Sequence, residues 1–161
     1  MEQFPIRKQN RLSSVQYNEN GVYFITICTR EKANLFWHVG AAMRRPPDCL
    51  TPAGKSAKEK ILRINDVYKG AVHVDNYVVM PNHIHLLLSL EKGGRRIAAP
   101  TISSVINQYK GAVSKELGVS CWQKSFHDHI VRNEADYRRI WEYIDANPGK
   151  WEEDCYYVSE E

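Results

Sequence analysis

Features that would assign a membrane, secreted or repeat protein are missing from this sequence of 161 residues. No apolar run approaches the roughly 20 residues that a membrane-spanning helix needs. The first residues, MEQFPIRKQNR, hold no apolar segment of the kind found in secretory signals. No segment of the chain is repeated elsewhere in it. We therefore expect a cytoplasmic protein that makes no contact with a membrane.

Paired cysteines and a strong charge bias are absent as well. The four cysteines are widely spaced and form no CxxC pair; they are Cys28, Cys49, Cys121 and Cys155. Such spacing is typical of reduced thiols in a cytoplasmic protein. The formal net charge is +3, which is compatible with a polyanion partner but does not demand one. With 43% hydrophobic residues, the chain suits one domain with a core of its own.

The stretch Val78–Leu90, VVMPNHIHLLLSL, carries the clearest local pattern. Pro81 interrupts an apolar run, and the residues after it alternate as in a β-strand, whose side chains switch faces at every residue. His83 and His85 therefore lie on one face of this strand. The opposite face is apolar and carries Ile84, Leu86 and Leu88. Two imidazoles separated by roughly 7 Å along a strand can bind one divalent ion, because imidazole is a ligand for several transition metals.

Hydrophobic periodicity and capping residues predict the remaining elements. We expect strands at Val22–Cys28, Ala71–Met80, the histidine stretch after Pro81, and Trp122–Arg132. Helices are expected at Pro52–Val67, Ile102–Leu117 and Glu134–Ala146, capped by Thr51, Thr101 and Asn133. Residues 30–50 are predicted as a loop with a short element near Leu35–Val39.

The order β-α-β-β-α-β followed by a helix predicts an α+β, ferredoxin-like fold. We expect an antiparallel sheet with helices on one face, a C-terminal helix, and the histidine strand in a central position. The domain organisation follows as a basic N-terminal arm (1–20), a single domain (21–154) and a C-terminal tail (155–161).

The last predicted helix places two polar side chains together. Tyr143 and Asn147 are four residues apart and so lie on one helical face. They lie beside an apolar stripe made of Tyr137, Ile140, Trp141 and Ile144. Asn147 is a candidate third ligand beside the two histidines, and the Tyr143 phenol is a candidate nucleophile. Tyr109 is the rival nucleophile, but it lies within the apolar stripe of helix Ile102–Leu117, so we favour a core position for it.

The segment PNHIHLL, with His83 and His85, resembles the HUH motif (His, hydrophobe, His) of the single-tyrosine HUH transposases. It is most similar to the REP-associated tyrosine transposases of bacteria. The segments GVYFITICT, CWQKSFHDHIVR and EYIDANP extend the resemblance over most of Gly21–Trp151, in the order that this family shows. Tyr143 follows His85 by 58 residues, and this combination is more specific than the histidines alone.

The resemblance implies an enzyme that cuts and rejoins single-stranded DNA beside hairpins formed by REP-like palindromes. It assigns His83, His85 and Asn147 as ligands of Mg²⁺ or Mn²⁺, and Tyr143 as the nucleophile that forms a 5′-phosphotyrosine. Asn147 stands where many relatives have glutamine, and its shorter side chain changes the ligand geometry. Members of this superfamily act as monomers or homodimers, and the short connection between Arg132 and Glu134 favours the monomer.

Binding of this DNA would depend on lysine and arginine contacts to phosphates. The candidates are Arg44, Arg45, Lys92, Arg95, Arg96, Lys110, Lys124, Arg132, Arg138 and Arg139. Trp37 and Trp122 are candidates for stacking on unpaired bases, although burial suits Trp122 better. We expect the N-terminal arm and the loop 91–100 to read the hairpin.

Two alternative functions stay open at this point. The first is a catalytically silent protein that binds DNA hairpins and retains the fold. The second is a metal-dependent hydrolase that uses both His-x-His pairs, because His127 and His129 share a strand face and Asp128 could join them in a zinc site. No HExxH or paired-cysteine spacing supports zinc, so we favour a structural or DNA-contacting role for the second pair.

Overall fold

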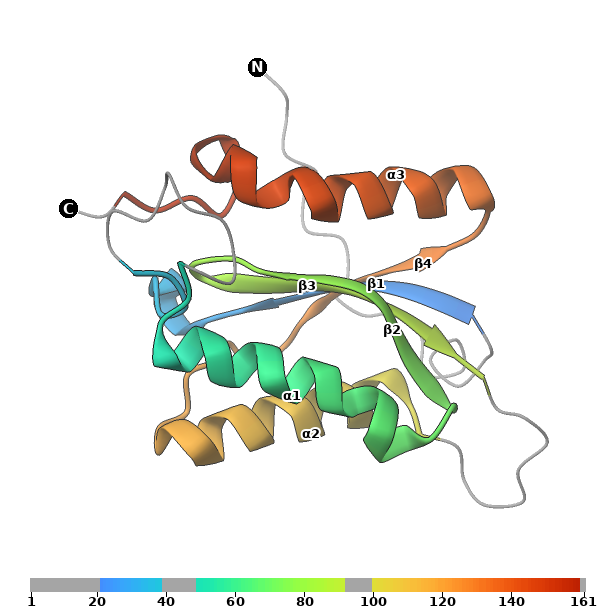
Figure 1. The fold of residues 1–161 in the computed structure, drawn as a ribbon, viewed down its shortest axis with the longest axis horizontal. Coiled ribbons are helices and arrows are strands. Elements are labelled where there is room, and N and C mark those ends of the chain that lie inside the picture. Colours follow the sequence, from blue (N-terminus) through green and yellow to red (C-terminus); the bar gives the residue numbers. More distant parts are fainter. Residues whose placement is uncertain (1–20, 39–48, 92–99, 160–161) are drawn as a thin grey trace.

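A computed structural model describes residues 21–38, 49–91 and 100–159 (Figure 1). The strands are β1 (Gly21–Cys28), β2 (Val72–Val79), β3 (His83–Leu90) and β4 (His127–Val131). The α-helices are α1 (Pro52–Tyr68), α2 (Ile102–Leu117) and α3 (Glu134–Ala146). Two short 3₁₀ segments, η2 (Arg30–Lys32) and η4 (Asn147–Glu153), complete the described elements.

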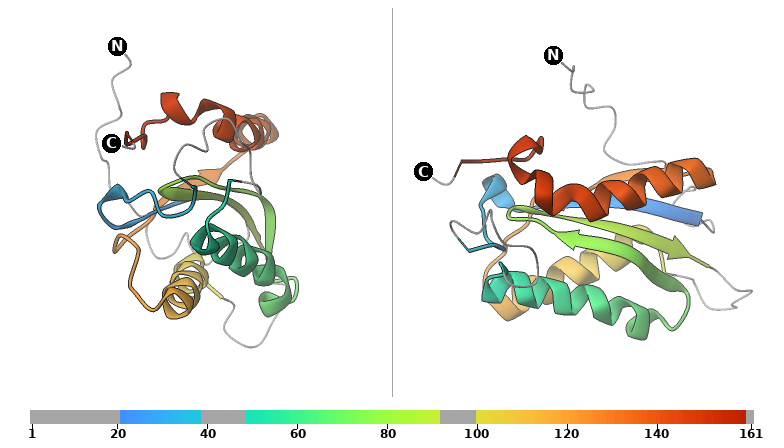
Figure 2. Two further views of the ribbon diagram at one scale, coloured as in Figure 1. Left: turned by 60° about the vertical axis from the view of Figure 1, so that its left-hand side comes forward. Right: turned by 45° about the horizontal axis from the view of Figure 1, so that its top comes forward.

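The four strands form one antiparallel sheet in the order β2-β3-β1-β4. This is the strand order of a ferredoxin-like β-α-β-β-α-β fold, and β3 lies in the interior of the sheet, so both predictions are confirmed. Helices α1 and α2 cover one face, while α3 lies across the other (Figures 1 and 2). The C-terminal helix therefore closes the second face of the sheet.

Strand β3 is buried on both faces. The side chains of Ile84, Leu86 and Leu88 point toward α1 and α2 and are fully buried. His83 and His85 point to the α3 side and are also buried. Strand alternation predicts one solvent-facing side in an antiparallel sheet, but α3 and the chain that follows it cover the histidine face. The two imidazoles therefore lie in the interior of the protein.

The helix starts follow from local capping. The Thr51 hydroxyl accepts a hydrogen bond from Gly54 N at 3.1 Å, and the Asn133 side chain accepts one from Asp136 N at 2.8 Å. Thr101 forms a reciprocal capping box with Ser104. These bonds satisfy amide groups that the first turn of a helix leaves without partners. The predicted caps are thus confirmed, and the predicted ranges of α2 and α3 match the structure.

Two local predictions are wrong. Strand β4 is shorter than the expected Trp122–Arg132, because Trp122 instead makes an isolated bridge to Thr29. Trp37, proposed as a surface for base stacking, is 4% exposed, and its indole donates to the Val79 carbonyl at 2.8 Å. Trp122 is equally buried. Neither indole ring is accessible to a nucleic-acid base.

The short element expected near Leu35–Val39 also differs. The helical turn lies earlier, at Arg30–Lys32, and Trp37 contributes an isolated bridge to Leu50. Val39 itself lies outside the described residues.

The cysteines agree with expectation, since all four are free thiols in the structure. Among the described residues, no helix has the length and apolar character required to cross a membrane.

Gly54 provides a test of packing in the first turn of α1. A Cβ atom at this position would lie 2.3 Å from the Phe36 carbonyl oxygen. We expect Gly54→Ala to lower the free energy of unfolding by roughly 1–3 kcal/mol, because backbone must move to make room. Gly111 in α2 is the control, since a Cβ there meets nothing within 4 Å. Gly111→Ala should stabilise by about 1 kcal/mol. Urea unfolding measures the free energy of unfolding of both variants. Equal changes in the two variants would contradict the packing explanation.

Candidate functional site

The site is built around the two imidazoles of β3. His83 and His85 alternate with apolar residues, so both rings lie on the α3 side of the sheet, with centroids 4.7 Å apart. Their exposed fractions are 0% and 2%. Histidine is seldom buried without partners, so the contacts of each ring nitrogen decide what the pair can do.

Each ring is held through its Nδ1 atom. Nδ1 of His83 lies 2.8 Å from Asn82 Oδ1, and Nδ1 of His85 lies 2.8 Å from the Thr26 hydroxyl. The Asn82 amide orientation is itself fixed, because its Nδ2 donates to the Tyr156 carbonyl at 2.7 Å. His83 therefore donates from Nδ1 and carries its lone pair on Nε2. Both Nε2 atoms are buried and have no hydrogen-bond partner.

Burial keeps the two imidazoles neutral. It lowers the pKa of His85 to about 3. Burial, together with the neighbouring imidazole, also lowers the pKa of His83 well below its usual value, against a smaller opposing effect of the Asn147 side chain. Neutral imidazole is the form that binds metal ions. At neutral pH the pair thus presents two neutral rings on the same side of the sheet, each with an Nε2 atom that has no hydrogen-bond partner.

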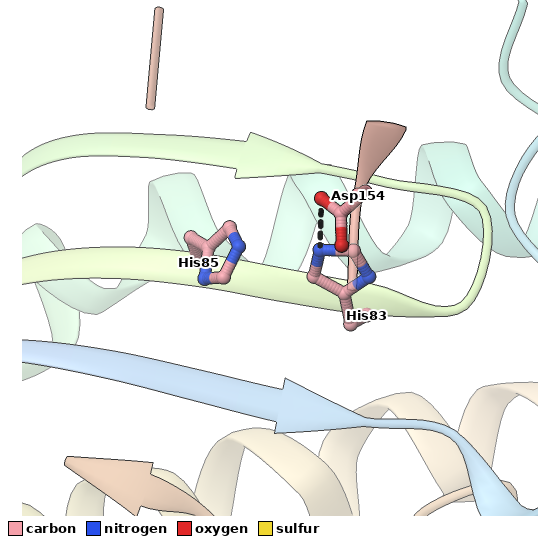
Figure 3. A group of neighbouring side chains, drawn as sticks. All are labelled: His83, His85 and Asp154. Carbon is pink, nitrogen blue, oxygen red and sulfur yellow. Dashed lines mark ion pairs between the residues drawn. The ribbon is translucent and has the colours of Figure 1, made fainter. Parts of the chain in front are cut away.

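The chain after α3 folds back over this pair. Segment η4 reverses direction, and Asp154 comes to lie above His83 (Figure 3). Its Oδ2 atom is 3.6 Å from His83 Nε2, and its side chain is fully buried. The ring of Tyr156 packs on His83 with centroids 4.6 Å apart. The histidine face is thus covered by residues that follow the tyrosine helix.

The donor atoms at this place suit a divalent cation. His83, His85 and Asp154 form the one group of three potential ligands found among the described residues, with ligand atoms within 4.8 Å of one another. Asn147 Oδ1 is also buried and has no hydrogen-bond partner. Buried polar atoms without hydrogen-bond partners lower the stability of a protein, and one cation would provide a partner for several of them. Two imidazoles with carboxylate and amide oxygens suit Mn²⁺ or a related divalent ion.

Tyr143 lies at the open side of the site. Its ring contacts His85 edge-on at a centroid distance of 5.4 Å and also contacts Phe24. The residue is 42% exposed, so one side meets the imidazole and the other meets solvent. Burial, followed by the nearby Asp154, raises the pKa of the phenol to about 12. The phenol therefore needs assistance to lose its proton at neutral pH.

Tyr109 is in a different part of the molecule. It belongs to α2, which covers the opposite face of the sheet (Figure 1). It is 4% exposed, and its hydroxyl donates to the Ala57 carbonyl at 3.0 Å. Burial raises its pKa well above the usual value. This tyrosine packs in the core, separated from the histidines by the sheet.

The second His-x-His pair shares the face of the first but not its centre. His127 pairs with Thr26 of β1, and Thr26 in turn pairs with His85. One strand therefore separates His127 from the site. His129 Nε2 lies 2.6 Å from an Asp136 oxygen, which ties β4 to the first turn of α3. Asp128 alternates to the opposite face of the sheet, so it does not join the two rings.

The predicted DNA-binding residues are dispersed. Lys110 donates to the Gln123 carbonyl at 2.6 Å on the α2 side, away from the histidines. Arg138 and Arg139 are exposed on α3, where each pairs with an acidic residue of the same helix. Exposed positions flanking β4 carry Lys124 and Arg132. The arm 1–20 and Arg44, Arg45, Lys92, Arg95 and Arg96 lie outside the described residues.

The sequence did not reveal several residues that contact the histidines. Asn82 lies inside the PNHIH segment, so its position beside His83 was a usable signal. Thr26 could be found only after the β1–β3 register was known. Asp154 and Tyr156 have no sequence signal, because only the fold-back after α3 brings them to β3. Trp141, assigned to an apolar stripe, is 37% exposed, while Ile140 and Ile144 of that stripe are buried.

Comparison with known proteins gives two sequence relatives. No family model matches the chain. An uncharacterised protein of Haemophilus influenzae is 30% identical over 173 residues, covering 94% of this chain and 93% of that protein. A REP-associated tyrosine transposase of Escherichia coli is 32% identical over 78 residues, covering 48% of this chain and 44% of that protein.

Two solved structures share the fold. A REP-associated tyrosine transposase bound to a REP hairpin matches with a TM-score of 0.60 at 22% identity, covering 93% of this chain and 74% of that one. A proposed transposase of Deinococcus radiodurans matches with a TM-score of 0.50 at 16% identity, covering 86% and 96%. These relatives agree with the motifs PNHIHLL and EYIDANP: the chain is similar in sequence to a REP-associated tyrosine transposase over 48% of its length and shares the fold of another over 93% of its length.

Proposed function

We propose that the protein is a metal-dependent single-strand DNA transesterase that cuts and rejoins DNA beside hairpins. Similarity to REP-associated tyrosine transposases supports an enzyme that acts on DNA. The observation that carries the finer proposal is the position of Tyr143. Its exposed phenol lies against His85, next to two imidazoles whose Nε2 atoms have no partner. A nucleophile beside a metal centre is the arrangement that this chemistry requires.

In this mechanism the Tyr143 oxygen attacks the scissile phosphorus in line. A bond forms between the phenol oxygen and phosphorus, and the bond from phosphorus to the 3′ oxygen breaks. The phenol loses one proton, and the leaving strand takes one up to become a 3′-hydroxyl. The product is a 5′-phosphotyrosine. Because one phosphodiester replaces another, the reverse attack by a 3′-hydroxyl rejoins the strand without ATP.

The proposed metal ligands are His83, His85 and Asn147. A bound divalent ion such as Mg²⁺ or Mn²⁺ would supply Lewis-acid stabilisation of charge at the phosphate. The chain's own contribution is orientation: Asn82 and Thr26 fix the two rings through Nδ1. Because Tyr143 is 42% exposed, we propose that an extended strand reaches it from the solvent side. We propose that Lys124, Arg132, Arg138 and Arg139 contact its phosphates.

The test is a covalent-adduct assay. The substrate is a 3′-labelled single-stranded oligonucleotide that carries a REP-type hairpin, incubated with protein and Mn²⁺. We expect a labelled protein–DNA species that survives denaturation and that EDTA prevents. An oligonucleotide of scrambled sequence without the hairpin serves as control and should give none. Tight hairpin binding without any adduct would contradict the transesterase and favour a catalytically silent binder.

A further inference from the structure

We propose that Asp154 is itself a ligand of the divalent cation. The set that the family resemblance implies comprises His83, His85 and Asn147, all located on β3 or at the end of α3. Asp154 comes from the chain beyond that helix, and its Oδ2 lies 3.6 Å from His83 Nε2. This inference rests on the proposed function, because it concerns the same metal centre.

The burial of the Asp154 carboxylate points to a cation. Its side chain has no exposed surface, and the groups that donate hydrogen bonds to it are neutral. Asn147 Nδ2 donates to Oδ2 at 3.1 Å, and the Tyr156 backbone N–H donates to Oδ1 at 2.8 Å. A buried charge is costly unless it is paired or coordinates a metal. The distance to His83 Nε2 is too long for a hydrogen bond, whereas both atoms can bind one ion.

Asn147 has two roles in this arrangement. Its Nδ2 atom orients the carboxylate of Asp154, so its Oδ1 atom is directed elsewhere. That oxygen is buried without a hydrogen-bond partner, like the two histidine Nε2 atoms. The amide therefore both supports the carboxylate ligand and offers an oxygen of its own. The ligand atoms of His83, His85 and Asp154 lie within 4.8 Å of one another.

Packing fixes the carboxylate where it is. Trp151 of η4 is buried and lies 6.0 Å from the His83 ring, measured between centroids. Tyr156 follows Asp154 in the sequence, and its ring packs on His83 with centroids 4.6 Å apart. Aromatic anchors before and after Asp154 thus hold the segment against the histidines. A ligand held by packed neighbours loses little freedom when the ion binds.

The test measures metal binding in the absence of DNA. Mn²⁺ is titrated into the full-length protein by calorimetry, and free Mn²⁺ is followed by electron paramagnetic resonance. We expect Asp154→Asn to weaken Mn²⁺ binding by at least about tenfold, since loss even of a residue that supports a ligand costs 10–100-fold. Glu152→Gln and Glu153→Gln are matched controls from the same segment. Both residues are exposed, and their variants should bind Mn²⁺ as the native chain does.

Two further measurements keep the outcome decisive. Asp154→Glu retains the charge and should bind Mn²⁺ more tightly than Asp154→Asn. If Asp154→Asn fails to fold, Mn²⁺ binding by Asp154→Glu is compared with binding by the native protein instead. Mn²⁺ affinity of Asp154→Asn equal to that of the native chain overturns the inference. The adduct assay on the same preparations separates the two proposals. If the native protein forms the adduct and Asp154→Asn binds Mn²⁺ as the native protein does, Asp154 is rejected as a ligand. The proposed transesterase activity is then still supported.

Discussion

We expect Tyr143→Phe to abolish the labelled covalent adduct while leaving hairpin binding intact. The variant keeps the ring that packs against His85 and Phe24 and removes only the oxygen that would attack phosphorus. Removal of an enzyme nucleophile lowers the rate by as much as about 10⁶-fold, so no adduct should be detected. Denaturing gels measure the adduct, and a gel-shift or fluorescence titration measures hairpin binding.

Tyr109→Phe is the matched control for this substitution. It also removes one phenol oxygen, but from the core beneath the opposite face of the sheet. We expect a normal adduct yield and a loss of stability of about 1 kcal/mol, from the lost hydrogen bond to Ala57. Loss of the adduct in the Tyr109 variant, with full activity in the Tyr143 variant, would reverse the assignment of the nucleophile.

We expect the buried histidine pair to make the metal-free protein less stable in acid. In the unfolded chain each imidazole binds a proton near pH 6.5. In the folded chain burial lowers the pKa of His85 to about 3 and that of His83 well below its usual value. Below pH 6.5 the unfolded state therefore binds more protons, and the free energy of unfolding falls as pH falls.

Well below pH 6.5 the expected slope approaches about 1.4 kcal/mol per pH unit for each histidine, and so roughly 3 kcal/mol per pH unit for the pair, whereas above pH 7 it is close to zero. Urea unfolding in the presence of EDTA, between pH 7.5 and 5, measures it. His85→Asn should have about half the slope of the native protein. The same replacement at the exposed His38 should leave the slope unchanged. An identical slope in the native and His85→Asn proteins would contradict a neutral buried pair.

Much of the local structure could be predicted because its causes are local. The ends of α2 and α3 depend on Thr101 and Asn133, which bind amide groups within their own first turns. The shared face of His83 and His85 follows from the two-residue period of a strand. The shared helical face of Tyr143 and Asn147 follows from the helical period in the same way. None of these inferences needs a contact between distant parts of the chain.

The wrong predictions concern contacts that span the chain. Trp37 is a sequence-based candidate for base stacking, but it is buried, and the Val79 carbonyl, 42 residues away, accepts its indole N–H. Strand β4 lost its first residues because Trp122 bridges to Thr29 and donates to the Lys110 carbonyl. Composition and periodicity describe a residue's neighbours along the chain, so they carry no information about such partners.

The sequence by itself determined the order of strands and helices, the pairing of His83 with His85 on one face, and the family motifs. Tertiary structure alone decided that α3 closes that face, that the imidazoles are buried and neutral, and that Asp154 lies 3.6 Å from His83. The physical reason is the reversal of the chain in η4, which brings a residue from beyond the last helix back to β3. Periodicity is a property of one segment, whereas this site forms where four segments meet.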